Sequence, residues 1–330
     1  MAISSQDAGL SESAGGLVST SGIVLAASRT GRYLSIVALL LILWLMRPQA
    51  NPLVNLLYTG AAVGCLYFAF GRRESFRPLI LYAVAFGTFA QLRSMADDTG
   101  LPAQFAYVVD MEERVFGVIP SAWLQERFYR PGVIGPLDGY LAVIYVSYFV
   151  VAHGVALLIW NKKRELFPLY ASALFLTLYA GLLTSFLLPT APPWLAASDG
   201  YIEPVHRVMG NILAEINPGA QAEGATIVGV NDIAAMPSLH MATTVLVALA
   251  ALRFAAPLRL AGVAYALSMG LSLVYLGEHY AVDVIAGALL AVAAWQLVPR
   301  LWPSRAASRL TAIAPLASAG ERHAEESTAA

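Results

Sequence analysis

The sequence has few charged residues for its length. Only 12% of its 330 residues are Asp, Glu, Lys or Arg, whereas about 25% is usual in a soluble domain, and 58% are hydrophobic. The formal net charge of −1 gives no reason to expect a nucleic-acid partner. The shortage of charge argues against an ordinary soluble domain and indicates an integral membrane protein.

Cysteine is also nearly absent. The single Cys65 lies inside an apolar run, so it can form no disulfide within the chain and no multi-cysteine metal site. The first residues, MAISSQDAGLSESAGG, lack the basic segment of a secretory signal peptide, and we expect none there. Residues 1–28 and 302–330 are rich in Ala and Ser, which predicts flexible tails around a single membrane domain at 29–301.

Long apolar runs are what the sequence contains instead. They lie near 30–47, 52–70, 78–96, 137–160, 167–188, 237–256, 258–277 and 281–301. Several are close to the roughly 20 residues needed to cross the hydrocarbon core of a bilayer. Backbone groups in lipid must be hydrogen-bonded within their own segment, so the runs predict an all-α, polytopic membrane bundle with about eight transmembrane helices.

The basic residues predict how these helices are oriented. If the N-terminus lies inside, most of the 20 basic residues fall on the cytoplasmic side, as the positive-inside rule requires. The outer side then holds only Arg47, Arg93, Arg114, Arg127, Arg130 and Arg207. We therefore expect a protein of the cell (plasma) membrane with both termini in the cytoplasm.

This orientation places two long loops outside, 97–136 and 189–236. The first contains FAYVVDMEERVFGVI and PSAWLQERFY, which mix apolar and charged residues at helical spacing. They predict helices that either lie on the membrane surface or pack on the bundle as a cap. The second begins PTAPPW, where prolines stop the preceding helix and Trp194 suits the headgroup level. Loops of this length often act as lids.

Two short motifs stand where apolar runs meet the outer side, MPSLH (236–240) and GEHYAVD (277–283). Two spans and a turn separate them, so a helical hairpin would return both to the same membrane face. Asp283 follows His279 by four residues, which would place both on one helix face. The carboxylate could then fix the imidazole tautomer and leave the other ring nitrogen free to attack.

These residues suit phosphoryl transfer. Pro237 fits the first turn of a helix whose free N–H groups and positive dipole end favour a phosphate, and Ser238 adds a hydroxyl donor. His240 could protonate a leaving oxygen while His279 attacks phosphorus and Asp283 stabilises the imidazolium. The product would be a phosphohistidine, and the set requires neither a metal nor another cofactor.

The two motifs resemble those of the type 2 phosphatidic acid phosphatase superfamily. The resemblance implies a six-helix phosphatase-like core in which His279 is the nucleophile, Asp283 its partner, His240 the general acid and Ser238 a phosphate ligand. PTAPPW together with PSLH and GEHY looks like the inositol phosphorylceramide synthase branch. The catalytic match covers 237–283, and the likeness to the branch extends back to about residue 90.

The sequence departs from the family pattern at three points. Leu239 stands where the second motif commonly has glycine, and Leu273 stands where the third motif usually has arginine. The first motif, Lys-x6-Arg-Pro, has no counterpart before residue 237. The cations that bind phosphate must then come from elsewhere, and the candidates on the outer side are Arg93 and Arg207. His153 and His206 are weaker candidates, since each suits a structural role as well.

The sequence therefore predicts a membrane enzyme that hydrolyses or transfers the phosphoryl group or phospho-headgroup of a lipid at the outer face. Its substrate would be a phospholipid, a sphingolipid or a polyprenyl phosphate. Water as acceptor would make it a lipid phosphatase, and a polyol such as inositol would make it a headgroup transferase. The alternative is a transporter or channel for an anion. Transporter sites lie near mid-membrane, however, whereas the polar residues of this sequence gather at one face.

Overall fold

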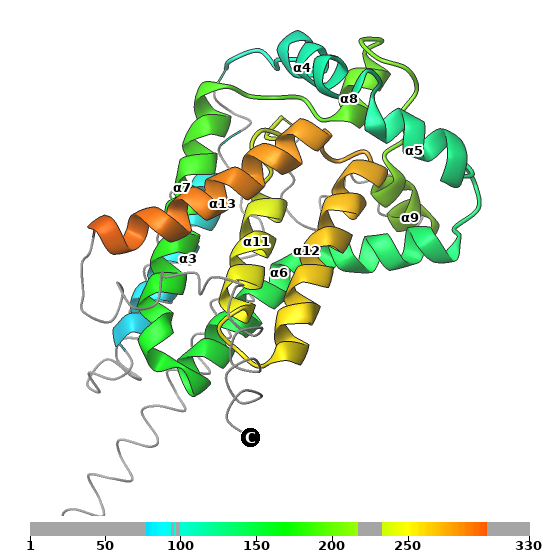
Figure 1. The fold of residues 1–330 in the computed structure, drawn as a ribbon. Helices are drawn as coiled ribbons and strands as arrows, with labels where there is room; N and C mark the ends of the chain where they lie inside the picture. The colour runs from blue at the N-terminus through cyan, green and yellow to red at the C-terminus, as the bar shows by residue number, and fades with distance from the viewer. Residues whose placement is uncertain (1–76, 94–95, 97–99, 217–232, 302–330) are drawn as a thin grey trace, which may run out of the picture. The chain divides into compact units, whose positions relative to one another are not determined.

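The computed structural model describes residues 77–93, 96, 100–216 and 233–301 (Figure 1). The chain divides into a unit of residues 1–83 and a unit of residues 84–330. Of the first unit only the start of helix α3 (Arg77–Arg93) is described, and every contact reported below lies within the second unit. The expected tails and the expected spans at 30–47 and 52–70 lie outside the described residues, and the boundaries of the membrane domain stay a prediction.

Within the described residues, the regular elements are helices, and four stretches are long and apolar enough to cross a membrane. They are α6 (Pro136–Lys162), the 3-10 turn η3 (Arg164–Leu166) with α7 (Phe167–Leu187), α12 (Ala256–Tyr275) and α13 (Ala281–Leu301). They match four of the expected spans, so the all-α membrane fold is confirmed for this part of the chain. Helix α3 corresponds to the span expected at 78–96, and the total of eight stays a prediction.

The helix expected near 237–256 is shorter than predicted, chiefly at its C-terminal end. Helix α11 (Leu239–Ala251) has 13 residues, a length of about 20 Å, which is short of the roughly 30 Å of bilayer hydrocarbon. It begins after Ser238, whose Oγ accepts the N–H of Met241 at 3.3 Å. Pro237 thus precedes the helix and is not in its first turn as expected. Helix α11 is enclosed by α6, α7, α12 and α13 (Figure 1).

Proline marks the start of many of these helices. It occupies one of the first two helical positions of α6, α7 and α12, and also of the shorter helices α5 (Pro120–Phe128) and α8 (Pro193–Ser198). A proline is tolerated there because the first N–H groups of a helix have no acceptor within it. These prolines therefore mark where the apolar runs begin as helices.

The first of the two loops predicted to lie outside, 97–136 (the first outer loop), contains the two helices expected from its sequence, α4 (Ala106–Phe116) and α5. Their buried faces contribute Val108 of α4 and Ala122 of α5 to an apolar cluster that includes Tyr280 and Val282 at the start of α13. The interpretation as a cap on the bundle is therefore confirmed for these faces. Contact of the opposite, exposed faces with a membrane stays a prediction.

The second of these loops, 189–236 (the second outer loop), is more helical than expected in its described residues, 189–216 and 233–236. Helix α7 ends at Leu187, directly before the prolines, as expected. Beyond them lie α8 and a further helix, α9 (Val208–Ile216), which were not expected. The N–H of Val208 donates to the carbonyl of Leu276 at 3.2 Å. The start of α9 is thereby tied to the turn that carries GEHY.

Candidate active site

His279 lies in the tight turn between α12 and α13. Gly277 in this turn has a φ of 76°, and a Cβ at this position would lie 2.7 Å from the carbonyl oxygen of His206. Only glycine satisfies both conditions without strain. The N–H groups of Glu278 and His279 donate to the carbonyl of Leu273 at 3.2 and 3.1 Å, so the turn is fixed to the end of α12.

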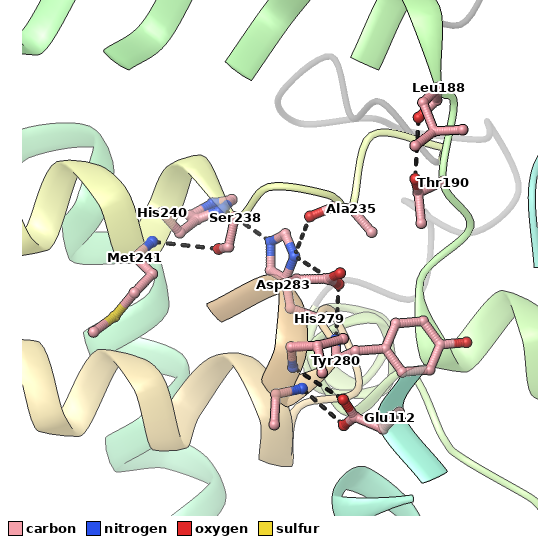
Figure 2. Close-up of polar contacts among 12 residues, drawn as sticks. Glu112, Leu188, Thr190, Ala235, Ser238, His240, Met241, His279, Tyr280 and Asp283 are labelled. Atoms are coloured by element: carbon pink, nitrogen blue, oxygen red, sulfur yellow. Dashed lines mark hydrogen bonds and ion pairs between the residues drawn. The ribbon is translucent and has the colours of Figure 1, made fainter. Parts of the chain in front are cut away.

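The His279 ring makes its polar contacts through both nitrogens, and Nδ1 has two neighbours (Figure 2). Nδ1 lies 2.9 Å from the carbonyl oxygen of Ala235 and 3.6 Å from Oδ2 of Asp283. Since a carbonyl oxygen can only accept, Nδ1 of the neutral ring carries the proton and Nε2 keeps its lone pair. This geometry favours the tautomer that we expected, with the backbone carbonyl making the shorter contact.

Asp283 reaches this ring for a reason other than the one expected. His279 precedes α13, so the two residues do not share a helix face. Asp283 lies in the first turn of α13, fully buried, and Oδ2 also accepts the N–H of Tyr280 at 2.9 Å. The carboxylate therefore caps the start of the helix and faces the ring of the residue just before it.

The carbonyl of Ala235 is held by two other extended segments. The N–H of Ala235 donates to the carbonyl of Thr190 at 3.0 Å, and Thr190 forms isolated parallel bridges with Gln104 and Ala234. Thr190 belongs to PTAPPW, and Gln104 belongs to the first outer loop. Both outer loops thus support the acceptor that orients His279.

His240 occupies the first turn of α11, and its Nδ1 lies 3.4 Å from Nε2 of His279. The hairpin of α11 and α12 brings the two motifs together as expected. The His240 ring stacks on Tyr145 with 4.8 Å between centroids and lies tilted against Tyr148 at 4.2 Å. Its Nε2 is buried and has no hydrogen-bond partner in the described part of the chain. The α6 tyrosines thus hold an imidazole whose second nitrogen remains available.

Ser238 is fully buried at the junction of α11 and α13. Its Oγ caps α11, as described above, and its N–H donates to the backbone carbonyl of Asp283 at 3.1 Å. A Cβ at Gly287 would lie 2.2 Å from the Ser238 carbonyl oxygen, so glycine permits this close approach. Ser238 therefore has a clear structural contact, and its predicted contact with phosphate stays a prediction.

Both histidines line a cavity of about 60 Å³, and the two candidate cations, Arg93 and Arg207, line it as well. A buried water needs about 10–15 Å³ of such space, so the cavity has room for a group of phosphate size but not for a whole lipid. The structure thus brings together His240, His279 and the two arginines, which come from separate parts of the sequence.

Arg207 is held by two residues that the sequence did not identify as part of the site. Its Nε lies 3.2 Å from Oε1 of Glu278, which is 8% exposed, and its Cζ lies 4.2 Å from the centroid of the Trp194 ring. If His279 and Asp283 shared a helix face, as expected, Glu278 would point to another face, but Glu278 and His279 both lie in the turn between α12 and α13. Trp194 lines the cavity, and its buried Nε1 has no hydrogen-bond partner among the described residues.

Glu112 of α4 is a further residue that the sequence did not identify. Its carboxylate is fully buried and accepts the N–H groups of Ala281 and Val282 at 2.8 and 2.9 Å (Figure 2). Burial raises the pKa of the Glu112 carboxyl above its ordinary value, and the two backbone donors oppose that rise. Helix α4 is thereby bonded to the first turn of α13.

Gln125 of α5 makes a similar contact with the backbone. Its amide oxygen accepts the N–H of His206 at 2.7 Å, and its amide nitrogen donates to the carbonyls of His206 and Tyr275 at 2.9 and 2.8 Å. The side chain is 4% exposed. Gln125 therefore ties the segment that carries Arg207 to the end of α12.

The departures from the family pattern are accommodated by packing. Leu273 is fully buried near the end of α12 and presents no polar group. Leu239 points at α7, where a Cβ on Gly181 would lie 2.3 Å from its Cδ2. The leucine therefore fits because α7 has glycine opposite it.

The other candidate histidines lie outside the cavity lining. His153 of α6 has its ring 4.3 Å from that of Phe86 in α3. The His206 side chain is exposed, with its ring 5.4 Å from that of Tyr129.

Comparison with known proteins gives two matches. Residues 107–297 match the model of a family described as the PAP2 superfamily. The chain is also 24% identical over 205 residues to the phosphoinositol dihydroceramide synthase of Bacteroides thetaiotaomicron, a match that covers 59% of this chain and 67% of that protein. No solved structure matches the chain. The residues that match the family model, 107–297, include both histidine motifs, PTAPPW and Glu112.

Proposed function

The chain belongs to the PAP2 superfamily and is a membrane enzyme acting on lipid phosphates, and we propose that it transfers a phosphoryl group or phospho-headgroup through a phosphohistidine at His279. One observation carries this proposal. Nε2 of His279 lies 3.4 Å from Nδ1 of His240, and both rings line a cavity that two arginines also line. Membership of an enzyme family leaves no support for the transporter alternative.

In the first step, Nε2 of His279 attacks phosphorus, and the bond from phosphorus to the leaving oxygen breaks. Protonated His240 gives its proton to that oxygen, which leaves as an alcohol. The phosphorylated His279 ring carries a positive charge. Its Nδ1–H donates to the Ala235 carbonyl, and the Asp283 carboxylate at 3.6 Å stabilises the charge.

In the second step, the hydroxyl of an acceptor attacks the phosphorus, and the bond from phosphorus to Nε2 breaks. Neutral His240 takes the proton of the attacking hydroxyl and is ready for another cycle. His279 returns to its starting tautomer because Nδ1 keeps its proton throughout. Both steps use the same pair of rings, which agrees with their close approach.

We assign the binding of the phosphate oxygens to Arg93 and Arg207, with the N–H of Trp194 and the hydroxyl of Ser238 as further donors. Guanidinium groups fork onto two oxygens of one phosphate, and such sites place cations against the charge of the transition state. The Nε1 of Trp194 is a buried donor in the cavity lining without a partner among the described residues, and a phosphate oxygen would satisfy it.

The name of the Bacteroides relative favours transfer over hydrolysis. That protein is a phosphoinositol dihydroceramide synthase. We therefore propose that the acceptor is an alcohol, either a polyol such as inositol or the hydroxyl of a lipid, and that the donor is a phospholipid, a sphingolipid or a polyprenyl phosphate. Water in place of the alcohol would give hydrolysis by the same two steps.

The experiment that tests this function uses purified protein in nanodiscs with a panel of radiolabelled lipid phosphates and diphosphates, with and without inositol or glycerol. Wild-type protein should yield free or transferred phosphate and a trapped phosphoprotein. His279→Ala should abolish turnover and trapping, whereas His153→Ala, which changes a histidine outside the cavity lining, should retain both. Near wild-type activity of His279→Ala would refute the mechanism.

We also propose that the site faces the extracytoplasmic side of the cell membrane and that both termini are cytoplasmic. Ser198 at the end of α8 is exposed and belongs to a predicted outer loop. A cysteine placed there in a Cys65→Ala background should react with a membrane-impermeant thiol reagent in intact cells. Labelling that occurs only after lysis would reverse the orientation.

A further inference from the structure

We propose that Glu112 is a positioning residue for the nucleophile, acting from α4 through the first turn of α13. The inference rests on the proposed function, because it assigns to His279 the attack on phosphorus. Glu112 lies 169 residues before Ala281 in the chain, yet its two carboxylate oxygens accept the N–H groups of Ala281 and Val282. Its contact therefore begins two residues after His279.

The start of α13 lacks a local cap of the usual kind. The residue before the helix is Tyr280, whose side chain cannot accept from the N–H groups of the first turn as Ser, Thr, Asp or Asn does. Asp283 accepts the N–H of Tyr280, and Glu112 accepts the next two. Three consecutive donors are thus satisfied by two carboxylates, one of which comes from the outer loop.

The carboxylate is well suited to fix this turn. Glu112 is fully buried, so its bonds to the backbone are not exchanged with water. A buried anion is costly unless it is paired, and here the two N–H donors and the positive end of the α13 dipole stabilise it. The pairing therefore holds α4 and the helix start at one fixed distance.

His279 is held on both sides by this arrangement. On its N-terminal side, the turn is bonded to the carbonyl of Leu273 in α12. On its C-terminal side, Glu112 fixes Ala281 and Val282. The contact of His279 Nε2 with His240 depends on both anchors, because a shift of the His279 backbone would move the ring away from His240. Loss of the Glu112 anchor would let the nucleophile shift while the cavity lining stays intact.

The test measures turnover and backbone protection in Glu112→Gln, with Glu113→Gln as the matched control, since Glu113 is its exposed neighbour on α4. Gln keeps the size but offers one acceptor oxygen. We expect kcat to fall about 100-fold with KM unchanged, because displacing a reacting atom by about 1 Å has a cost of that order. Hydrogen exchange at 280–283 should rise, and formation of the phosphoprotein should slow in a single turnover.

Glu112→Asp supplies a second variant if Glu112→Gln does not fold. Its carboxylate is one methylene shorter and should restore part of kcat. Wild-type kcat in Glu112→Gln, or in Glu112→Asp together with raised hydrogen exchange at 280–283, would overturn the inference even if the melting temperature falls, because the contact would then be structural only. A wild-type protein without any turnover would instead refute the proposed function and the catalytic part of this inference with it.

Discussion

The buried polar side chains of the bundle and those of the first outer loop have different partners next to the cavity. In α11, α13 and the turn before α13, His240, His279 and Asp283 face one another through their side chains. In α4 and α5, Glu112 and Gln125 bind backbone groups of other segments. Side chains that face each other around a cavity can exchange protons, whereas side chains that bind backbone fix its position. On our proposal, the bundle supplies the reacting groups, and the outer loop holds the backbone next to them.

If the bundle supplies the reacting groups, replacing one of them should strongly lower turnover and leave the fold intact. His240→Ala should lower kcat on lipid substrates by about 100- to 10,000-fold, the usual contribution of a general acid. An activated aryl phosphate needs little protonation of its leaving group, so its turnover should fall much less. The measurement compares kcat for the two substrate classes. Equal losses on both would show that His240 is not the acid.

The arginines test the division at the boundary between the two regions, because Arg93 belongs to α3 and Arg207 to the second outer loop. Arg93→Lys and Arg207→Lys should each lower kcat/KM about 100-fold, since losing one donor to transition-state charge has that cost. Lysine keeps the charge but loses the forked geometry. Of the two variants, we expect Arg93→Lys to cause the larger fall in kcat/KM.

The control for the arginine variants is Arg127→Lys. Arg127 is an exposed residue of α5 whose Cζ lies 4.1 Å from the centroid of the Trp123 ring on the same helix, and it is not part of the cavity lining. Its replacement should leave kcat/KM unchanged. Normal activity in both Arg93→Lys and Arg207→Lys would assign the phosphate to the helix start at Ser238 and to Trp194.

The smallest effect on chemistry is expected at Gln125 of α5, where stability should suffer first. Gln125→Leu removes three hydrogen bonds and leaves backbone groups of His206 and Tyr275 without this partner. Leaving a buried polar group unsatisfied costs about 1–3 kcal/mol, so the unfolding midpoint in detergent should fall. The exposed neighbour Glu126→Gln serves as control. An unchanged midpoint would show that α5 does not hold the Arg207 segment.

Much of the bundle could be predicted from the sequence because membrane helices are encoded locally. A run of about 20 apolar residues is sufficient to predict a span, and four such runs are helices in the structure. The error at α11 has the same origin. Leu252 to Ala255 are largely apolar, so composition alone extended the helix through what is a turn.

Helix α9 was missed although its sequence carries a signal. Val208, Met209 and Ile212 recur at helical spacing and are the residues that pack on the bundle. Glu278 was missed because His279 and Asp283 were expected to share a helix face, which would point Glu278 to another face. Gly277 is the signal that could have corrected this, since a glycine after an apolar run often ends a helix.

The sequence by itself determined the membrane class, the main helices and the pair of histidines, because apolar length and motif residues are local properties. Only the tertiary structure decided what holds those residues. The contacts of Glu112 with Ala281, of Gln125 with His206 and of Arg207 with Glu278 join positions 169, 81 and 71 residues apart. No periodicity in the chain encodes such pairs, since each forms only when separate helices pack and leave a buried donor and a buried acceptor side by side.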